Sequence, residues 1–369
     1  MKIAFYHNVP AGGAKRVVYE QVKHLSKKHK VEVFEFKSED SKYCDLKKIT
    51  RVNQYLFVPA NNLPFFLKRI YSDIKIFYSL KKINHLIAQH IDTKGFDIVV
   101  VHSDKYIQAP YLLRYLKTPS IYYAHETLRY VYESHLIFNK KNFILKKWYE
   151  NLTRYIRKND DIKNINSATK ILCNSKYTSE NIMKTYGLES VVSYPGVDAI
   201  FFRPLKFLKK IDILFIGEKV SNEGYEILLG ALKQMRKYIV VKILDRKNDR
   251  FSLSDQDLVK EYNKSKIVLA LNTKEPFGLI PLEAMSCGVP VIAVSEGGFR
   301  ETVLNNITGY LIEKSPNALK TRIEKLLSNS SLHNAMGKNA RNIILKEWDI
   351  KKRMLEFEKL IYSFIEKEK

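Results

Sequence analysis

The sequence predicts an α/β protein made of two Rossmann-like halves. Each half opens with a strand, a helix and a second strand, over residues 1–36 in the first and 211–244 in the second. Apolar runs of strand length alternate with helical periodicity along the chain, which is typical of parallel sheets covered by helices. The 369 residues suffice for two such domains. We place the linker at residues 191–204 and expect the two halves to face a central cleft.

The composition favours anionic partners. Lys and Arg number 63 against 39 Asp and Glu, a formal net charge of +24. This excess suits diphosphate substrates, phospholipid or nucleic acid, although a coding bias towards Lys, Ile and Asn would produce it too. The three cysteines lie far apart and indicate neither a disulfide framework nor a zinc site, so we expect a reducing cytoplasm. We also expect no signal peptide and no membrane-spanning helix.

The first half begins as a βαβ unit with a glycine turn. Residues 1–6 and 31–36 read as strands, and 14–27 as a helix with one apolar face. Gly12 and Gly13 follow the first strand, but they lack the G-x-G-x-x-G spacing of a dinucleotide site. Either the backbone here approaches a phosphate or an acceptor sugar, or the glycines simply form the turn.

Two histidines follow later strands of the first half. The strand at 96–101 ends at His102, and the strand at 120–124 ends at His125. Side chains at the carboxyl ends of parallel strands face the ligand site of an open sheet, although a loop histidine bonded to backbone remains the alternative. Residues 63–86 and 142–157 combine apolar faces with many lysines. They either pack on the sheet or rest on an anionic membrane.

The second half contains the most informative stretch, residues 274–301. A strand at 267–271 precedes Glu275, and a helix carrying Glu283 follows before the next strand and Gly297-Gly298. The backbone N–H groups of Phe277, Gly278 and Leu279 lie between the two carboxylates, where a helix N-terminus suits a phosphate group. Two carboxylates on either side of a phosphate site fit a nucleotide sugar. Other predicted helices are 224–233, 254–262 with Ser254 as its cap, and a final one carrying Trp348.

These residues resemble a known family. E-P-F-G-L, E-A-M-x-C-G-x-P-V-I-A, G-G-x-x-E and T-G-x-L occur between residues 275 and 311 in the order and spacing of family 4 of the retaining glycosyltransferases. The resemblance is dense over 270–313 and scattered elsewhere. It implies the GT-B fold, with an acceptor-binding domain at 1–196, a donor-binding domain at 197–348, and a helix at 349–369 that packs back on the first.

The resemblance also implies roles for individual residues. Glu275 would meet the hydroxyls of the donor sugar, and Glu283 the ribose hydroxyls. Phe277, Gly278 and Leu279 would take the diphosphate through their backbone. In the first domain, Gly12 and Gly13 match the glycine loop near the diphosphate and the acceptor, and His125 matches a histidine that touches the transferred sugar. The family works mostly without a metal, so we expect neither metal nor cofactor beyond the nucleotide-diphosphate sugar.

The chain departs from the family at two cationic positions. Where an Arg and a Lys usually point at the diphosphate, this sequence has Glu218 and Glu223, and carboxylates there oppose phosphate binding. Lys219 would enter the site after a slip of one residue, and Arg246, Lys247 and Lys274 are further candidates.

We therefore expect a retaining, metal-independent transfer of a hexose to a saccharide or lipid-linked acceptor. The alternative is a weakened or non-catalytic relative that binds sugar nucleotide or assists an assembly. We expect peripheral contact with an anionic membrane at its cytoplasmic face, and no nucleic acid partner.

Overall fold

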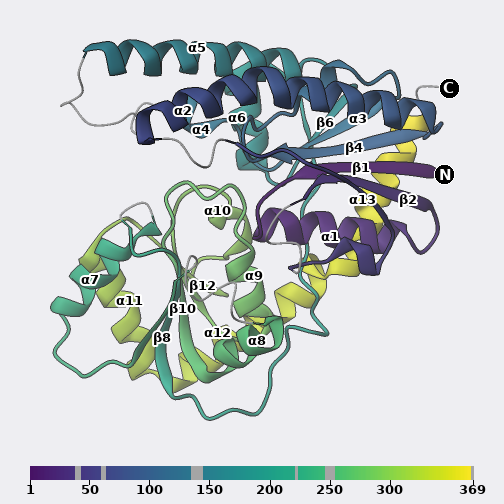
Figure 1. Cartoon of the computed structure of the whole chain (residues 1–369). Coiled ribbons are helices and arrows are strands. Elements are labelled where there is room, and N and C mark those ends of the chain that lie inside the picture. The colour runs from purple at the N-terminus through teal and green to yellow at the C-terminus, as the bar shows by residue number, and fades with distance from the viewer. Residues whose placement is uncertain (38–42, 60–63, 134–143, 221–222, 246–253, 367–369) are drawn as a thin grey trace. The chain divides into compact units, whose positions relative to one another are not determined.

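The computed structural model of the chain describes residues 1–37, 43–59, 64–133, 144–220, 223–245 and 254–366. It forms two compact units. Unit 1 comprises Met1–Asn174, Thr178–Ser193 and Phe357–Lys369, and unit 2 comprises Ser175–Tyr177 and Tyr194–Glu356. The α/β prediction is confirmed, because each unit is a parallel sheet with helices (Figure 1).

Unit 1 has a parallel sheet in the order β3-β2-β1-β4-β5-β6-β7. Its strands are β1 (Lys2–Asn8), β2 (Lys30–Phe36), β3 (Arg51–Tyr55), β4 (Ile98–Asp104), β5 (Ser120–Ala124), β6 (Lys170–Cys173) and β7 (Val191–Val192). The central strands are buried along their length, which is why they read as continuous apolar runs rather than alternating ones.

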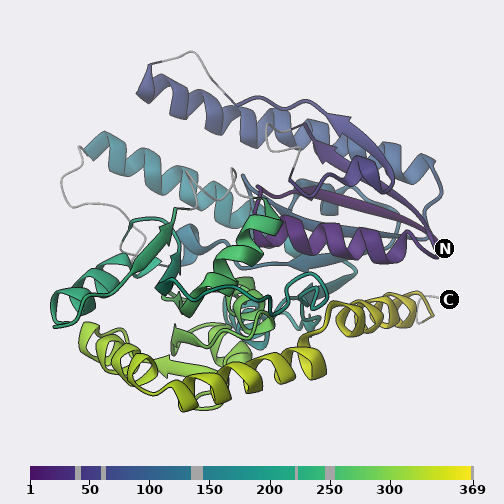
Figure 2. The same cartoon turned by 90° about the horizontal axis from the view of Figure 1, so that it is seen from below.

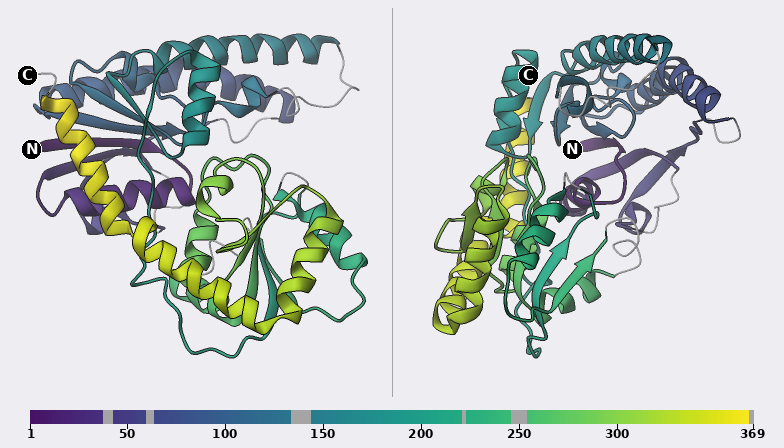
Figure 3. Two further views of the ribbon diagram at one scale, coloured as in Figure 1. Left: turned by 180° about the vertical axis from the view of Figure 1, so that it is seen from behind. Right: turned by 90° about the vertical axis from the view of Figure 1, so that its left-hand side faces the viewer.

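The helices of unit 1 lie on both faces of its sheet (Figure 1). They are α1 (Gly13–Leu25), η2 (Leu46–Lys48), α2 (Phe65–Ile74), η3 (Lys75–Leu80), α3 (Lys81–Thr93), η4 (Tyr111–Arg114), α4 (Arg129–Tyr132), α5 (Ile144–Ile165) and α6 (Lys176–Tyr186), the last beginning with residues of unit 2. Side chains of η3 and α3 fill the core against β1 and β4. Helices α2 and α5 lie side by side (Figures 1 and 3), joined by an ion pair of 3.1 Å between Arg69 and Glu150.

Unit 2 has a smaller parallel sheet in the order β12-β11-β10-β8-β9. Its strands are β8 (Ile211–Ile216), β9 (Val241–Leu244), β10 (Ser265–Ala270), β11 (Val291–Val294) and β12 (Gly309–Ile312). Its helices are α7 (Tyr225–Lys233), α8 (Asp255–Lys264), α9 (Leu279–Ser286), α10 (Phe299–Thr302), α11 (Pro316–Ser328), α12 (Ser330–Ile343) and η7 (Ile344–Trp348). Strand β11 is buried throughout and β10 at every residue except Lys266, and the two strands form the centre of one large apolar core.

The last helix, α13 (Ile350–Glu366), starts in unit 2 and joins unit 1 from Phe357 onwards. In unit 1, the Glu358 carboxylate lies 2.8 Å from His24 Nε2 and 3.3 Å from both Lys28 Nζ and His29 Nε2. These contacts join α13 to the end of α1 (Figures 2 and 3). The expected return of the last helix to the first domain is therefore confirmed.

The prediction that the last helix carries Trp348 is wrong, because α13 begins at Ile350. Trp348 ends the π-helical segment η7, and the residue after it is extended. The linker causes the break, because Val197 N–H donates to Trp348 O and Ile350 N–H donates to Val197 O. These two hydrogen bonds hold residue 349 in a strand-like conformation and prevent a continuous helix.

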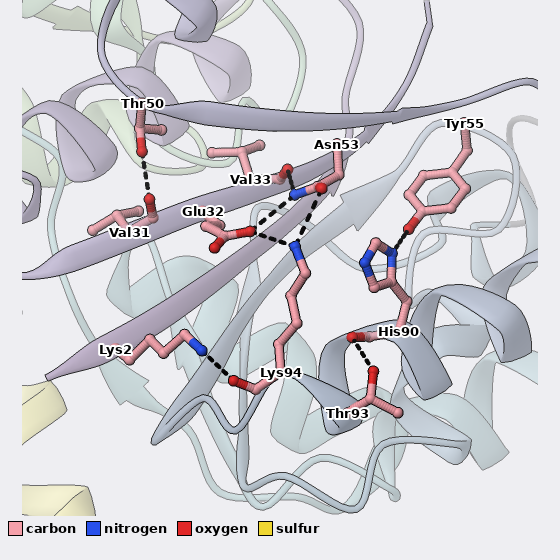
Figure 4. A network of polar contacts seen from close by, with 10 residues as sticks. All are labelled: Lys2, Val31, Glu32, Val33, Thr50, Asn53, Tyr55, His90, Thr93 and Lys94. Carbon is pink, nitrogen blue, oxygen red and sulfur yellow. Dashed lines mark hydrogen bonds and ion pairs between the residues drawn. The ribbon is translucent and has the colours of Figure 1, made fainter.

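Strand β3 is the one strand of the described sheets that the sequence did not predict. It is a half-buried edge strand with the sequence RVNQY. It pairs with β2 through the main chain, and polar side-chain contacts further attach it to β2 and α3 (Figure 4). Asn53 Nδ2 donates to Glu32 Oε2 at 3.3 Å, Lys94 Nζ donates to the same oxygen at 2.6 Å, and Tyr55 Oη lies 2.5 Å from His90 Nδ1.

Within the described part of the chain, every helix is too short or too polar to cross a lipid bilayer.

Candidate functional site

In unit 1 the chain reverses its winding direction between β1 and β4, the point where ligands bind in open parallel sheets. A buried carboxylate occupies this point. Asp104 accepts hydrogen bonds from Asn8 Nδ2 at 2.8 Å, Tyr6 Oη at 3.3 Å and the Tyr106 backbone N–H at 2.7 Å. Burial raises the pKa of Asp104 above its ordinary value. Side chains from two strands therefore fix the carboxyl edge of this sheet.

The two predicted histidines meet beside this network. His102 Nδ1 lies 3.0 Å from His125 Nε2, and both residues are buried. Asn174 Nδ2 donates to His125 O at 2.8 Å and so fixes the backbone of His125. His7, at the end of β1, pairs with Glu35 at 3.1 Å. His102 is thus a direct partner of the candidate residue His125.

The glycine turn of unit 1 is open. Gly12 has a φ of 151°, and a Cβ added to it would meet no atom within 4 Å. Gly13 is the first residue of α1, and the described side chains leave this helix N-terminus uncapped. An uncapped start with space beside it suits an anionic group. The turn at Gly12 and Gly13 therefore leaves space beside its backbone among the described residues.

In unit 2 the winding direction reverses between β8 and β10. The loops after these two strands interlock. A Cβ on Gly224 would lie 2.3 Å from Leu271 Cβ, and Asn272 Nδ2 donates to Glu223 Oε2 at 2.6 Å. The loop that contains Glu275 and the loop that contains Lys219 are therefore neighbours.

The loop with Glu275 is held by backbone packing against the glycine pair after β11. Gly298 N–H donates to Glu275 O at 2.9 Å. A Cβ on Gly297 would lie 2.2 Å from Glu275 O, and one on Gly298 would lie 2.5 Å from Phe277 Cα. Only glycine permits this approach. The Glu275 side chain is half-buried, and its position depends on main-chain atoms.

Helix α9 follows this loop with an uncapped N-terminus. Gly278 precedes the helix with a φ of 87° and provides no side-chain cap. The N–H groups of Phe277, Gly278 and Leu279 have no acceptor among the described residues. Three such groups at the positive end of a helix are suited to bind an anion. Only 279–286 is helical, so Glu275 stands on the loop and Glu283 on the helix.

Glu283 is almost entirely buried. It is 2% exposed, and its Oε2 accepts a hydrogen bond of 2.7 Å from Tyr262 Oη on α8. Burial, and then the charge of Glu283, raise the pKa of the neighbouring Cys287 thiol to about 12. The carboxylate therefore already has a structural partner, Tyr262, which sequence reasoning missed because it lies 21 residues away on another helix.

The structure places Glu223 and two of the four candidate cations, Lys219 and Lys274. Glu223 lies beside Gly217, with its Oε2 2.9 Å from an added Cβ there. Lys219 is exposed, and Lys274 has a left-handed backbone whose N–H donates to Glu296 at 3.2 Å. The other two candidates, Arg246 and Lys247, lie outside the described residues.

A further carboxylate of the motif region has a clear structural role. Glu301 accepts the backbone N–H groups of Lys176 and Tyr177, each at 2.9 Å, and the Tyr194 hydroxyl at 2.8 Å. It thus caps the first residues of α6. The sequence shows Glu301 as part of G-G-x-x-E, but the residues it caps are more than 100 positions away.

Among the described residues, no group of three or more His, Cys, Asp or Glu side chains is arranged to hold a metal. Cys44, Cys173 and Cys287 are free thiols.

The chain matches two family models that together cover most of it. Residues 11–200, just over half of the chain, match the model described as Glycosyltransferase Family 4. Residues 247–343 match the model described as Glycosyl transferases group 1.

The chain is also similar to individual proteins of known sequence or structure. The chain is 30% identical over 202 residues to an uncharacterized glycosyltransferase of Methanocaldococcus jannaschii, covering 50% of this chain and 57% of that protein. It is 34% identical over 171 residues to N-acetyl-alpha-D-glucosaminyl L-malate synthase of Bacillus anthracis, covering 46% and 45%. The chain thus spans about half the length of these curated relatives. The crystal structure of Anabaena HepE with UDP-glucose has a TM-score of 0.70 at 17% identity, over 98% of this chain and 100% of that one.

Proposed function

The chain belongs to glycosyltransferase family 4 and shares the GT-B fold, and we propose that it transfers a hexose from a nucleotide-diphosphate sugar to a saccharide or lipid-linked acceptor with retention of configuration. One observation carries this proposal. The glycine pair Gly297-Gly298 holds the loop of Glu275 directly before the uncapped start of α9. Such a loop would hold the Glu275 carboxylate beside an anion site, as a sugar diphosphate requires.

Unit 2 is the proposed donor domain, with residues 197–348 as its extent. The N–H groups of Phe277, Gly278 and Leu279 would bind the diphosphate, and Glu275 would bind hydroxyls of the sugar. Glu283 would bind the ribose hydroxyls. Glu283 is buried and accepts a hydrogen bond from Tyr262. This contact would therefore require the ribose to come close to α9 and β10.

Unit 1 is the proposed acceptor domain, with residues 1–196 and the returning helix. Gly12 and Gly13 would allow close approach of the acceptor or a phosphate oxygen, because none of the described side chains occupies the space beside Gly12. His125 would contact the transferred sugar.

The proposed chemistry is stabilisation of a leaving group. When the sugar–phosphate bond breaks, negative charge grows on the nucleotide diphosphate. Backbone N–H groups aimed at that charge lower the barrier, and one such donor contributes about 100-fold or more in rate. Lys219, exposed on the loop after β8, is the proposed cation beside them.

The test is Glu275→Gln, which keeps the shape of the side chain and removes its charge. We expect nucleotide diphosphate release to fall at least about 100-fold across a panel of glucosyl, N-acetylglucosaminyl and mannosyl donors, with an unchanged melting temperature. Glu313→Gln, an exposed carboxylate after β12, is the matched control. Wild-type turnover in the Glu275 variant would refute the proposed site.

The alternative function, a weakened or non-catalytic relative, is favoured by Glu218 and Glu223. Glu223→Gln separates the two functions, because an amide oxygen still accepts from Asn272 while the negative charge is lost. For an active enzyme we expect donor KM to fall about fivefold, roughly the effect of 1 kcal/mol of electrostatic repulsion. Glu324→Gln, exposed on α11, should change nothing. Absence of nucleotide diphosphate release with any donor, in wild type and variant alike, would favour the non-catalytic alternative.

We also propose that the α2 and α5 layer of unit 1 contacts an anionic membrane. Two apolar stripes at helical spacing remain exposed there. The first stripe consists of Leu67, Tyr71 and Ile74 on α2 and Tyr78 on η3, exposed by 45–70%, and the α5 stripe consists of Trp148, Leu152 and Tyr155, exposed by 40–65%. Exposed lysines stand next to both, including Lys68 and Lys158. Apolar stripes flanked by lysine are typical of helices that lie in a lipid interface.

Vesicle binding tests this contact. We expect the protein to bind phosphatidylglycerol vesicles and not phosphatidylcholine vesicles, with affinity reduced at least about tenfold by Tyr71→Ser with Tyr78→Ser, or by Trp148→Ser with Tyr155→Ser. Tyr238→Ser removes an aromatic ring that is 91% exposed in unit 2, and it should have no effect. Equal binding by all variants would exclude this layer.

A further inference from the structure

A pair of buried histidines at the carboxyl ends of β4 and β5 has a defined hydrogen-bond direction. His102 Nδ1 and His125 Nε2 are 3.0 Å apart, so one ring must donate and the other accept. We infer that His102 donates from Nδ1, which fixes His125 as the tautomer with its hydrogen on Nδ1.

Both rings are neutral near pH 7. Burial, and then the charges of His125 and His7, lower the pKa of His102 well below its ordinary value. Burial, and then the charge of His7, lower the pKa of His125 to about 3. His7 itself is paired with Glu35. The contact between His102 and His125 is therefore an N–H···N bond between two neutral imidazoles, each carrying one hydrogen.

The surroundings of His102 select the direction. His102 is fully buried, and its other nitrogen, Nε2, has no hydrogen-bond partner among the described residues. If His125 donated, His102 would have to carry its hydrogen on Nε2, as an orphaned N–H in an apolar site. Phe5 stacks on the face of the His102 ring, with centroids 6.0 Å apart and planes at 17°, so it offers no π acceptor along the ring edge.

If His102 donates instead, only a lone pair is left unused at Nε2. Buried N–H groups without an acceptor are rare in folded proteins, and unused acceptors are tolerated more often. The arrangement in which His102 Nδ1 donates therefore has the lower cost. It leaves His102 with an unprotonated Nε2 and His125 with an unprotonated Nε2 that accepts.

The consequence lies at the other side of the His125 ring. His125 Nδ1 has no partner among the described residues, and the residue keeps a small exposed fraction of 8%. In the inferred tautomer Nδ1 carries the hydrogen, so it can donate to a hydroxyl or phosphate oxygen and cannot take a proton. His125 would then act as a hydrogen-bond donor to the ligand rather than as a general base, and His102 is its positioning residue. The role toward ligand rests on the proposed function, whereas the tautomer does not.

The direct test is the imidazole ¹⁵N spectrum of the intact protein at pH 7, with His125→Gln and His102→Gln spectra for assignment. We expect His125 and His102 each to show a protonated Nδ1 and an unprotonated Nε2. Protonation of His125 on Nε2 in the wild-type protein overturns the inference.

A variant then tests the cause. His102→Phe keeps an aromatic ring between Phe5 and Tyr123 and removes the donor. We expect the His125 signals to move towards a mixture of tautomers, with kcat about tenfold lower and KM little changed. His85→Phe, an exposed histidine stacked on Tyr115, is the control and should leave both unchanged. A His125 tautomer unaffected by His102→Phe contradicts the inference. If the protein proves to have no transferase activity, the spectrum still decides the tautomer, so the two failures are distinguishable.

Discussion

The candidate sites of the two units are held in place by different parts of the chain. In unit 2, the loop of Glu275 is fixed by main-chain packing against Gly297 and Gly298. In unit 1, side chains hold the site, with Asp104 at the centre of three hydrogen bonds and His102 bonded to His125. A site of the first kind tolerates loss of its functional side chain but not an added methyl group. A site of the second kind tolerates an added methyl group but not the loss of its functional side chain.

The largest effect is expected from Gly297→Ala. The new Cβ would lie 2.2 Å from Glu275 O on a backbone with a φ of 56°, so the loop must move. We expect a loss of about 4 kcal/mol of stability, about 1 from the left-handed backbone and about 3 from overpacking. Trp348 reports this loss, because its ring lies 5.6 Å from that of Phe277 in the same loop. Urea unfolding followed by Trp348 fluorescence, in a Trp148→Phe background, measures it.

Gly95→Ala is the matched control for this substitution. Gly95 has a φ of 62°, close to that of Gly297, but a Cβ there meets nothing within 4 Å. We expect a cost of only about 1 kcal/mol, since the backbone strain remains and the clash is absent. Equal costs for the two glycines would mean that main-chain packing does not hold the loop of Glu275.

The second prediction compares the loss of a carboxylate side chain in unit 1 with the loss of one in unit 2. Asp104→Ala leaves the Tyr6 hydroxyl, the Asn8 amide and the Tyr106 N–H without their buried acceptor, and we expect about 3 kcal/mol of destabilisation. Glu275→Ala should change stability by less than about 0.5 kcal/mol, because the backbone oxygen rather than the side chain makes the contact with Gly298. Thermal unfolding of both variants measures the difference. Similar losses would remove the distinction between the two sites.

The same distinction explains what the sequence could predict. Close backbone approaches require glycine at fixed positions, so the loop of unit 2 left a readable motif. Ser254 likewise caps α8 by accepting from Asp257 N–H at 3.2 Å, which its spacing indicated and the structure confirms. In contrast, the partners Tyr262 of Glu283 and His102 of His125 lie on other elements, 21 and 23 residues away. Only the sheet register and helix packing bring them together.

Two other features of the fold could not be predicted from the local sequence pattern. Strand β3 has no alternating apolar pattern, because it lies at the sheet edge and is attached by polar side chains. The break before α13 was also unreadable, since Trp348 and Ile350 continue a helical pattern while their hydrogen bonds go to Val197 in the linker. In both places long-range hydrogen bonds override the local pattern.

The smallest effect is expected from Glu32→Gln, at the edge of the unit 1 sheet where β3 pairs with β2. In the network of Figure 4, two side chains meet at one carboxylate, with Lys94 Nζ and Asn53 Nδ2 donating to Glu32. Although burial acts to raise it, these hydrogen bonds lower the pKa of Glu32 below its ordinary value. Gln keeps the shape and a neutral hydrogen bond, so we expect a loss of about 1 kcal/mol at pH 7, the difference between a charge-assisted and a neutral bond.

The pH dependence identifies the charge as the cause. Because the folded protein holds Glu32 at a lowered pKa, its stabilisation is fully present above the unfolded value of about 4.3 and is lost as the pH falls through the lowered folded value. The stability difference between wild type and Glu32→Gln should therefore shrink as the pH is taken from about 6 to about 3. Urea unfolding at a series of pH values measures it, with exposed Glu324→Gln as the control. A difference that stays constant with pH would mean that packing, rather than the carboxylate charge, attaches β3 to the sheet.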